Sequence, residues 1–74
     1  MDKINILLVE GIHPAAKQRL EEEGFTVDLI SHAPDEQELL HLLPKYNALG
    51  IRSKTELTKK VLEQNKQLIS VGCF

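Results

Sequence analysis

Short apolar runs alternate with amphipathic stretches along the whole chain. The run at residues 4–9 is rich in isoleucine, leucine and valine, which predicts a strand buried on both faces. Apolar and polar residues partly alternate at 25–30, which predicts a second strand with one less buried face, near an edge of the sheet. Apolar residues at 48–51 and 68–71 predict two more short strands. We therefore expect four strands.

Three helices are expected between these strands. The first opens at Pro14, which the first helical turn tolerates, and ends at Gly24. The second begins at Asp35, which has the capping-box spacing from Glu38. The third begins after Thr58, a residue type that commonly caps helices.

Regular alternation of strands and helices is typical of an α/β fold, with helices on both faces of a parallel sheet. The simplest topology is a flavodoxin-like strand order 2-1-3-4. Such sheets normally have a fifth strand, so we expect the 74 residues to be an incomplete part of a domain. Ligands bind at the carboxyl ends of such strands, near the reversal of strand order, which here means residues 10–13, 52–55 and 72–74.

Composition narrows the class of protein. With 42% hydrophobic and 27% charged residues, the chain is expected to fold rather than stay disordered. A net charge of −2 gives no basic surface for nucleic acid, and no run approaches the roughly 18 apolar residues of a membrane span. We therefore expect neither a nucleic-acid nor a membrane partner. A single cysteine and the lack of a secretory signal favour the cytoplasm.

Arg52 and Ser53 are the strongest candidates for ligand binding. Arg52 follows the third strand, and its planar guanidinium suits a carboxylate or a phosphate. The alternative is a surface arginine paired with a nearby glutamate. The Ser53 hydroxyl either joins the same ligand or satisfies a backbone group of the loop.

Other polar residues give weaker signals. Glu10 follows the first strand, but one carboxylate alone indicates little. His13 is interpreted as the entry residue of the first helix, and His32 and His41 as loop and helix-surface residues. Cys73 is interpreted as a small apolar residue of a buried strand rather than a nucleophile.

Several motifs are absent from the sequence. It contains no G-x-G-x-x-G, no G-x-x-x-x-G-K-[ST] and no G-x-S-x-G, and its histidines lack metal-ligand spacing. No catalytic, cofactor-binding or metal-binding residue is therefore assigned in this segment. The residues alone indicate an anion-binding half-site on an α/β sheet.

Three stretches resemble a known enzyme family across essentially the whole chain. They read ILLVEGIH at 6–13, LGIRSKTELT at 49–58 and LISVGCF at 68–74. In this order they resemble the amino-terminal portion of the D-3-phosphoglycerate dehydrogenases, within the D-2-hydroxyacid dehydrogenase family. The Arg-Ser-Lys-Thr-x-Leu-Thr block and the Val-Gly-Cys-Phe end are the more specific parts of the resemblance.

The resemblance implies an NAD-dependent oxidoreductase that converts 3-phosphoglycerate, or a related 2-hydroxy or 2-oxo acid, on the route to L-serine. Residues 1–74 would form the N-terminal part of the substrate-binding domain, with the NAD-binding domain absent from this chain. Arg52 and Ser53 match the pair that contacts the anionic substrate in this family. The family's catalytic histidine and dinucleotide loop come later, so the segment alone is expected to be inactive. Family members are homo-oligomers.

Two other interpretations stay open. The start ILLVE also resembles a response-regulator receiver, although a receiver needs an acidic cluster after its first strand and an aspartate on its third. Here Gly11 follows Glu10, and Arg52 ends the third strand. The other alternative is a stand-alone anion-binding or interaction domain. In every case a sheet without its fifth strand exposes an edge, which predicts self-association.

Overall fold

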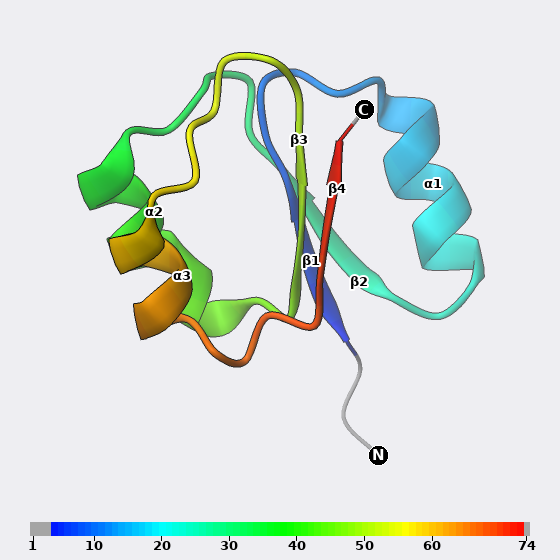
Figure 1. Cartoon of the computed structure of the whole chain (residues 1–74). Coiled ribbons are helices and arrows are strands. Elements are labelled where there is room, and N and C mark those ends of the chain that lie inside the picture. Colours follow the sequence, from blue (N-terminus) through cyan, green and yellow to red (C-terminus); the bar gives the residue numbers. More distant parts are fainter. Residues whose placement is uncertain (1–3, 74) are drawn as a thin grey trace.

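All four expected strands are present in the computed structural model, which describes residues 4–73. They pair in parallel in the order β2-β1-β3-β4 (Figure 1), which confirms the α/β class and the flavodoxin-like order. In chain order the elements are β1 (Asn5–Leu8), α1 (Pro14–Glu22), β2 (Thr26–Leu29), α2 (Glu36–Leu42), a 3₁₀ turn (Leu43–Lys45), β3 (Ala48–Ile51), α3 (Lys59–Gln64) and β4 (Ser70–Cys73).

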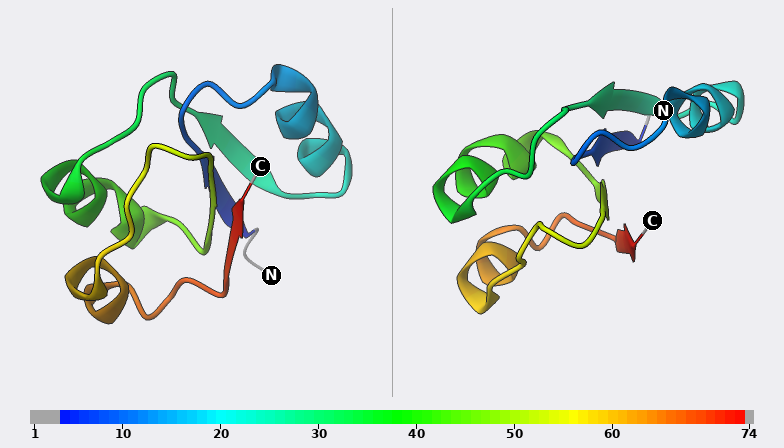
Figure 2. Two further views of the ribbon diagram at one scale, coloured as in Figure 1. Left: turned by 45° about the horizontal axis from the view of Figure 1, so that its top comes forward. Right: turned by 90° about the horizontal axis from the view of Figure 1, so that it is seen from above.

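Helices cover both faces of the sheet (Figures 1 and 2). α1 lies on one face, beside β2, and α2 and α3 lie together on the other. Because side chains alternate along β1, Leu7 and Val9 pack towards α2 and α3, whereas Ile6 and Leu8 pack towards α1. All four side chains are buried, which confirms a strand covered on both faces. Within residues 4–73, no helix combines the length and apolar character needed to cross a membrane.

Side-chain caps fix where the helices begin. His13 Nδ1 accepts a hydrogen bond of 3.0 Å from a backbone amide in the first turn of α1, and Thr58 Oγ1 accepts one of 3.3 Å in α3. At α2, Asp35 Oδ1 accepts the Glu38 amide at 2.9 Å. The Glu38 side chain contacts His32 rather than returning to the cap. The predicted helix starts are confirmed. Of the two contacts of a capping box, only the one from the Glu38 amide to the Asp35 side chain is formed.

β4 begins two residues later than predicted. It spans Ser70–Cys73 rather than 68–71, because its ladder with β3 starts where Ser70 pairs with Ala48. The residue before it, Ile69, lies outside this ladder and donates its amide to the Asn47 carbonyl oxygen at 2.7 Å. The first two residues of the predicted run therefore precede the strand, and residues 70 and 71 form its first half.

β4 is also more exposed than predicted. Ile69 and Val71 are 69% and 41% exposed. Cys73 was expected in a buried strand, and that expectation is wrong because its side chain is exposed. The reason is the position of β4, which lies at the edge of the sheet and has a strand neighbour only at β3 among the described residues.

Candidate functional site

The loops that follow β1, β2 and β3 meet at the carboxyl ends of the strands, at the top of Figure 1. Together they form an open crevice with a volume of about 440 Å³. Each loop contributes a short segment to its lining: Glu10; Ser31, His32 and Ala33; and Arg52, Ser53 and Lys54. The crevice lies at the reversal of strand order between β1 and β3, where parallel sheets bind their ligands.

Two of the three lining segments lie where the strand order predicts them. Glu10 and residues 52–54 follow β1 and β3, the two strands at the reversal. Residues 31–33 were not expected in the lining. The predicted pairing of β1 with β2 could have placed them there, because it brings the end of β2 to the same edge of the sheet.

The other expected positions do not line the crevice. His13 caps α1 with its ring nitrogen, as the helix-entry interpretation predicts. Gly72 and Cys73 lie within β4 and contribute nothing to the lining. Phe74 lies outside the described residues.

The Glu10 carboxylate holds the loop that follows β3. Its Oε2 accepts hydrogen bonds from the backbone amides of Arg52 at 2.8 Å and Thr55 at 2.9 Å. Its Oε1 accepts the amide of Lys54 at 2.8 Å. One side chain thus satisfies three backbone donors of a loop that no regular element supports, so Glu10 has a structural role that its sequence position alone does not reveal.

The backbone at Glu10 adopts a conformation that is unusual for a residue with a side chain. Glu10 and Gly11 both have φ of 65°, in the left-handed region. The Glu10 amide donates to the His32 carbonyl oxygen at 3.0 Å, and the Gly11 amide donates to that of Ile30 at 3.1 Å. Such a conformation costs energy and persists where the surroundings fix it, often at functional sites.

The same contacts set the ionisation of Glu10. Partial burial works to raise the pKa of its carboxyl group, but the Thr55 side chain and the backbone amides of residues 52, 54 and 55 outweigh this effect. They lower the pKa of Glu10 from 4.5 to about 2. The Thr55 hydroxyl is buried but does not reach hydrogen-bond geometry with any described residue, so the three backbone amides, with their distances of 2.8 to 2.9 Å, are the firmer cause of the lowered pKa. Glu10 is therefore an anion at neutral pH.

The side chains of Arg52 and Ser53 are left available to a ligand. Both are exposed and line the crevice. Within residues 4–73, Arg52 forms no ion pair, and Glu10 contacts its backbone amide instead of its guanidinium. The surface ion pair that was the alternative interpretation of Arg52 is therefore not formed among the described residues. A free guanidinium can bind a carboxylate or a phosphate through two parallel hydrogen bonds.

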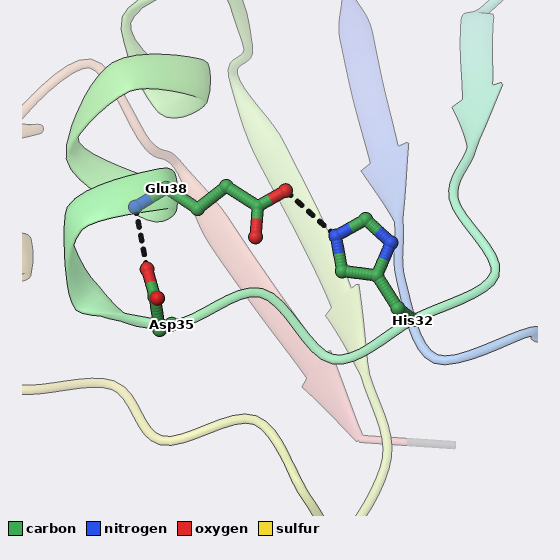
Figure 3. A network of polar contacts seen from close by, with 3 residues as sticks. All are labelled: His32, Asp35 and Glu38. Carbon is green, nitrogen blue, oxygen red and sulfur yellow. Dashed lines mark hydrogen bonds and ion pairs between the residues drawn. The ribbon is translucent and has the colours of Figure 1, made fainter.

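His32 forms part of the crevice wall and contacts α2 (Figure 3). Its Nε2 lies 2.6 Å from Glu38 Oε2, and Asp35 caps the helix beside them. Because the His32 and Glu38 side chains are 53% and 41% exposed, solvent screens this contact, and such pairs contribute at most about 1 kcal/mol. His32 is a loop residue, as predicted, but it borders the site. Lys54, an exposed residue of the loop after β3, adds a positive charge to the lining.

The part of the chain that the structure describes forms neither a metal site nor the acidic site of a receiver. No three His, Cys, Asp or Glu side chains of residues 4–73 gather where they could hold a metal ion. A receiver's acidic cluster is not formed either, because β3 leads into Arg52 and the Glu10 carboxylate is bound by backbone amides. His41 lies on the exposed surface of α2.

Three known proteins with similar sequences share the name D-3-phosphoglycerate dehydrogenase. D-3-phosphoglycerate dehydrogenase of Dictyostelium discoideum is 45% identical over 73 residues, which are 99% of this chain and 18% of that protein. A putative D-3-phosphoglycerate dehydrogenase of Schizosaccharomyces pombe is 40% identical, with 99% and 16% covered. D-3-phosphoglycerate dehydrogenase of Escherichia coli K12 is 36% identical, over 99% of this chain and 18% of that protein. The chain thus spans less than a fifth of the length of these relatives.

The family model agrees with these relatives. Residues 6–74 match the catalytic domain of the D-isomer specific 2-hydroxyacid dehydrogenases. This match includes all of β3 and the loop that carries Arg52 and Ser53. The chain therefore belongs to the D-isomer specific 2-hydroxyacid dehydrogenase family.

Proposed function

We propose that the crevice binds the anionic part of a 2-hydroxy acid, and that the complete protein is an NAD-dependent oxidoreductase. Its reaction would be the oxidation of 3-phosphoglycerate to 3-phosphohydroxypyruvate in L-serine biosynthesis. The names of the similar proteins support this reaction. In this proposal residues 1–74 form the N-terminal part of a substrate-binding domain, and the complete enzyme is a cytoplasmic homo-oligomer.

One observation carries the proposal. Arg52 lies at the carboxyl end of β3, lines the crevice, and has no acidic side-chain partner among residues 4–73. A 3-phosphoglycerate molecule carries a carboxylate and a phosphate, either of which accepts two hydrogen bonds from a guanidinium. The Ser53 hydroxyl supplies a further donor, and the Lys54 ammonium adds positive charge to the same wall. Arg52 and Ser53 would thus bind and orient the substrate without taking part in bond breaking.

The described residues do not fit a dinucleotide. A phosphate-binding turn needs several glycines and free backbone amides at the start of a helix. The loop between β1 and α1 has one glycine, Gly11, and α1 opens with Pro14, which has no amide hydrogen to donate. We therefore place the NAD site in another part of the complete protein and assign no residue of this chain to it.

Steady-state kinetics of the complete protein test the proposal. We expect Arg52→Ala to raise the KM for 3-phosphoglycerate by roughly 10- to 100-fold, because a fixed bidentate contact is lost. Arg52→Lys should recover only part of this loss, since an ammonium group cannot form the planar fork. The KM for NAD should stay unchanged. Arg19→Ala, at an exposed position of α1, is the matched control. An unchanged substrate KM in Arg52→Ala contradicts the proposal.

A further inference from the structure

We propose that Glu10 is a positioning residue: its carboxylate fixes the loop after β3 in the conformation that presents Arg52 and Ser53 to an anionic substrate. The inference rests on the proposed function of this crevice and adds a residue to it. Glu10 itself would touch no reacting atom.

The pattern of hydrogen bonds around Ser53 supports this role. Of the four consecutive backbone amides from residue 52 to residue 55, three donate to Glu10, at 2.8 to 2.9 Å. The amide of Ser53 has no partner among residues 4–73. The carboxylate therefore holds the loop on both sides of Ser53, while the Ser53 hydroxyl and amide remain available as donors.

Glu10 can fix the loop because its own backbone is fixed. Its left-handed turn, with φ of 65°, is bound through two amides to the loop after β2. Through its carboxylate and the backbone of its turn, Glu10 thus connects the end of β1 to the loops that follow β2 and β3. This arrangement costs a strained backbone, because Glu10 has a side chain and occupies a conformation that glycine adopts more readily. A function for that side chain accounts for the cost.

The charge of Glu10 does not oppose an anionic ligand as a free carboxylate would. Three amide dipoles point at its two oxygens and offset its negative charge. Glu10 does not pair with the guanidinium of Arg52, since its carboxylate contacts only the Arg52 backbone amide. A carboxylate at the edge of an anion site is therefore compatible with anion binding.

The side-chain chemistry predicts a sharp difference between similar residues. Gln at position 10 keeps the shape but replaces one acceptor oxygen with an NH₂ donor. In either orientation that NH₂ faces at least one backbone amide, so a donor meets a donor. Asp keeps both acceptors but is one methylene shorter. We expect Glu10→Gln to disturb the loop most and Glu10→Asp to retain part of the contact.

Kinetics of the complete protein, as a double-mutant cycle, test the inference. Glu10→Gln should raise the KM for 3-phosphoglycerate by roughly tenfold or more, with kcat and the KM for NAD within about twofold of the unmodified enzyme. In the Arg52→Ala background the same change should raise the KM by a clearly smaller factor, because only the Ser53 donors are then left to position. Glu22→Gln, which removes one charge from an exposed site on α1, is the control.

A separate readout follows the loop itself. Hydrogen exchange of the peptide containing residues 52–55 should be faster in Glu10→Gln than in Glu22→Gln. If Glu10→Gln does not fold, Glu10→Asp carries both measurements and should show smaller changes in the same direction.

The outcomes separate the inference from the proposed function. A raised KM in Arg52→Ala together with an unchanged KM in Glu10→Gln overturns the inference alone. Equal effects of Glu10→Gln with and without Arg52 also overturn it, because they show that Glu10 acts independently of the guanidinium. An unchanged KM in Arg52→Ala overturns the proposed function, and with it the inference.

Discussion

The Glu10 carboxylate accepts the backbone amide of Arg52 at 2.8 Å, although 42 residues separate the two in sequence. The contact joins the end of β1 to the loop after β3 and leaves the Arg52 guanidinium free. In the proposed site, loop geometry and ligand binding are thus divided between two residues: Glu10 holds the backbone of the loop, and Arg52 would present the positive charge to the ligand.

This contact predicts a pH dependence of stability. The pKa of Glu10 is lowered from 4.5 to about 2 in the folded chain. A lowered pKa stabilises the folded state above pH 4.5, and this contribution is lost as the pH falls from about 4.5 to about 2. Urea unfolding at several pH values should therefore show that the unmodified chain has a higher free energy of unfolding than Glu10→Gln at neutral pH. This difference should shrink as the pH falls from about 4.5 to about 2.

Other carboxylates also titrate in this range, so the difference between the two chains is the quantity to measure. Glu22→Gln has the same net charge as Glu10→Gln and controls for it. A difference between the unmodified chain and Glu10→Gln that stays constant from pH 6 to pH 2 contradicts the role assigned to the hydrogen bonds.

The cap of α2 predicts a difference between two substitutions at one position. Asp35→Ala removes the oxygen that accepts the Glu38 amide, and it should lower the free energy of unfolding by about 1 kcal/mol. Asp35→Asn keeps an acceptor oxygen and should be nearly neutral. Urea unfolding at neutral pH measures both. Equal losses for the two variants would show that the cap hydrogen bond is not the cause.

The core predicts a contrast between two leucines. Leu39 of α2 is fully buried between the sheet and α3, so Leu39→Ala should lower the free energy of unfolding by about 2–5 kcal/mol. Leu62 of α3 is 44% exposed, and Leu62→Ala should cost no more than about 1 kcal/mol. Thermal or urea unfolding compares them. Similar losses at both sites would contradict the placement of the core.

The edge strand predicts self-association of the 74-residue chain. Val71 of β4 and Ile69, which lies just before the strand, are exposed, and no strand among residues 4–73 pairs with the outer edge of β4. Sedimentation of the chain should show a mass that rises with concentration, and Val71→Lys should reduce this association. Lys60→Ala, on the exposed surface of α3, is a control that should leave it unchanged. A monomer mass at all concentrations overturns the prediction.

Local patterns were sufficient to predict most of the fold. The apolar run of β1 indicated a strand covered on both faces, and capping residues such as Asp35 and Thr58 marked helix starts that the structure confirms. Alternation of the elements then gave the strand order. The local pattern did not indicate the exposure of Cys73, because an apolar run has the same sequence pattern in an edge strand as in a central one; the exposure follows instead from the edge position of β4 in the strand order.

The candidate site was predictable only in part. The strand order placed Arg52 and Ser53 at the crevice, because the carboxyl ends of β1 and β3 must meet there. The role of Glu10 depends on a contact between distant loops, which no local pattern encodes. The place of His32 depends on β2 lying beside β1, so it follows from the topology but not from its own neighbours in sequence.

Direct titration of 3-phosphoglycerate into the complete protein tests the central claim most directly. The claim is that Arg52 binds the anionic substrate, and calorimetry measures this without depending on turnover. We expect the Kd of Arg52→Ala to be roughly tenfold or more above that of the unmodified protein, while Arg19→Ala binds as the unmodified protein does. An equal Kd for Arg52→Ala and the unmodified protein contradicts the account.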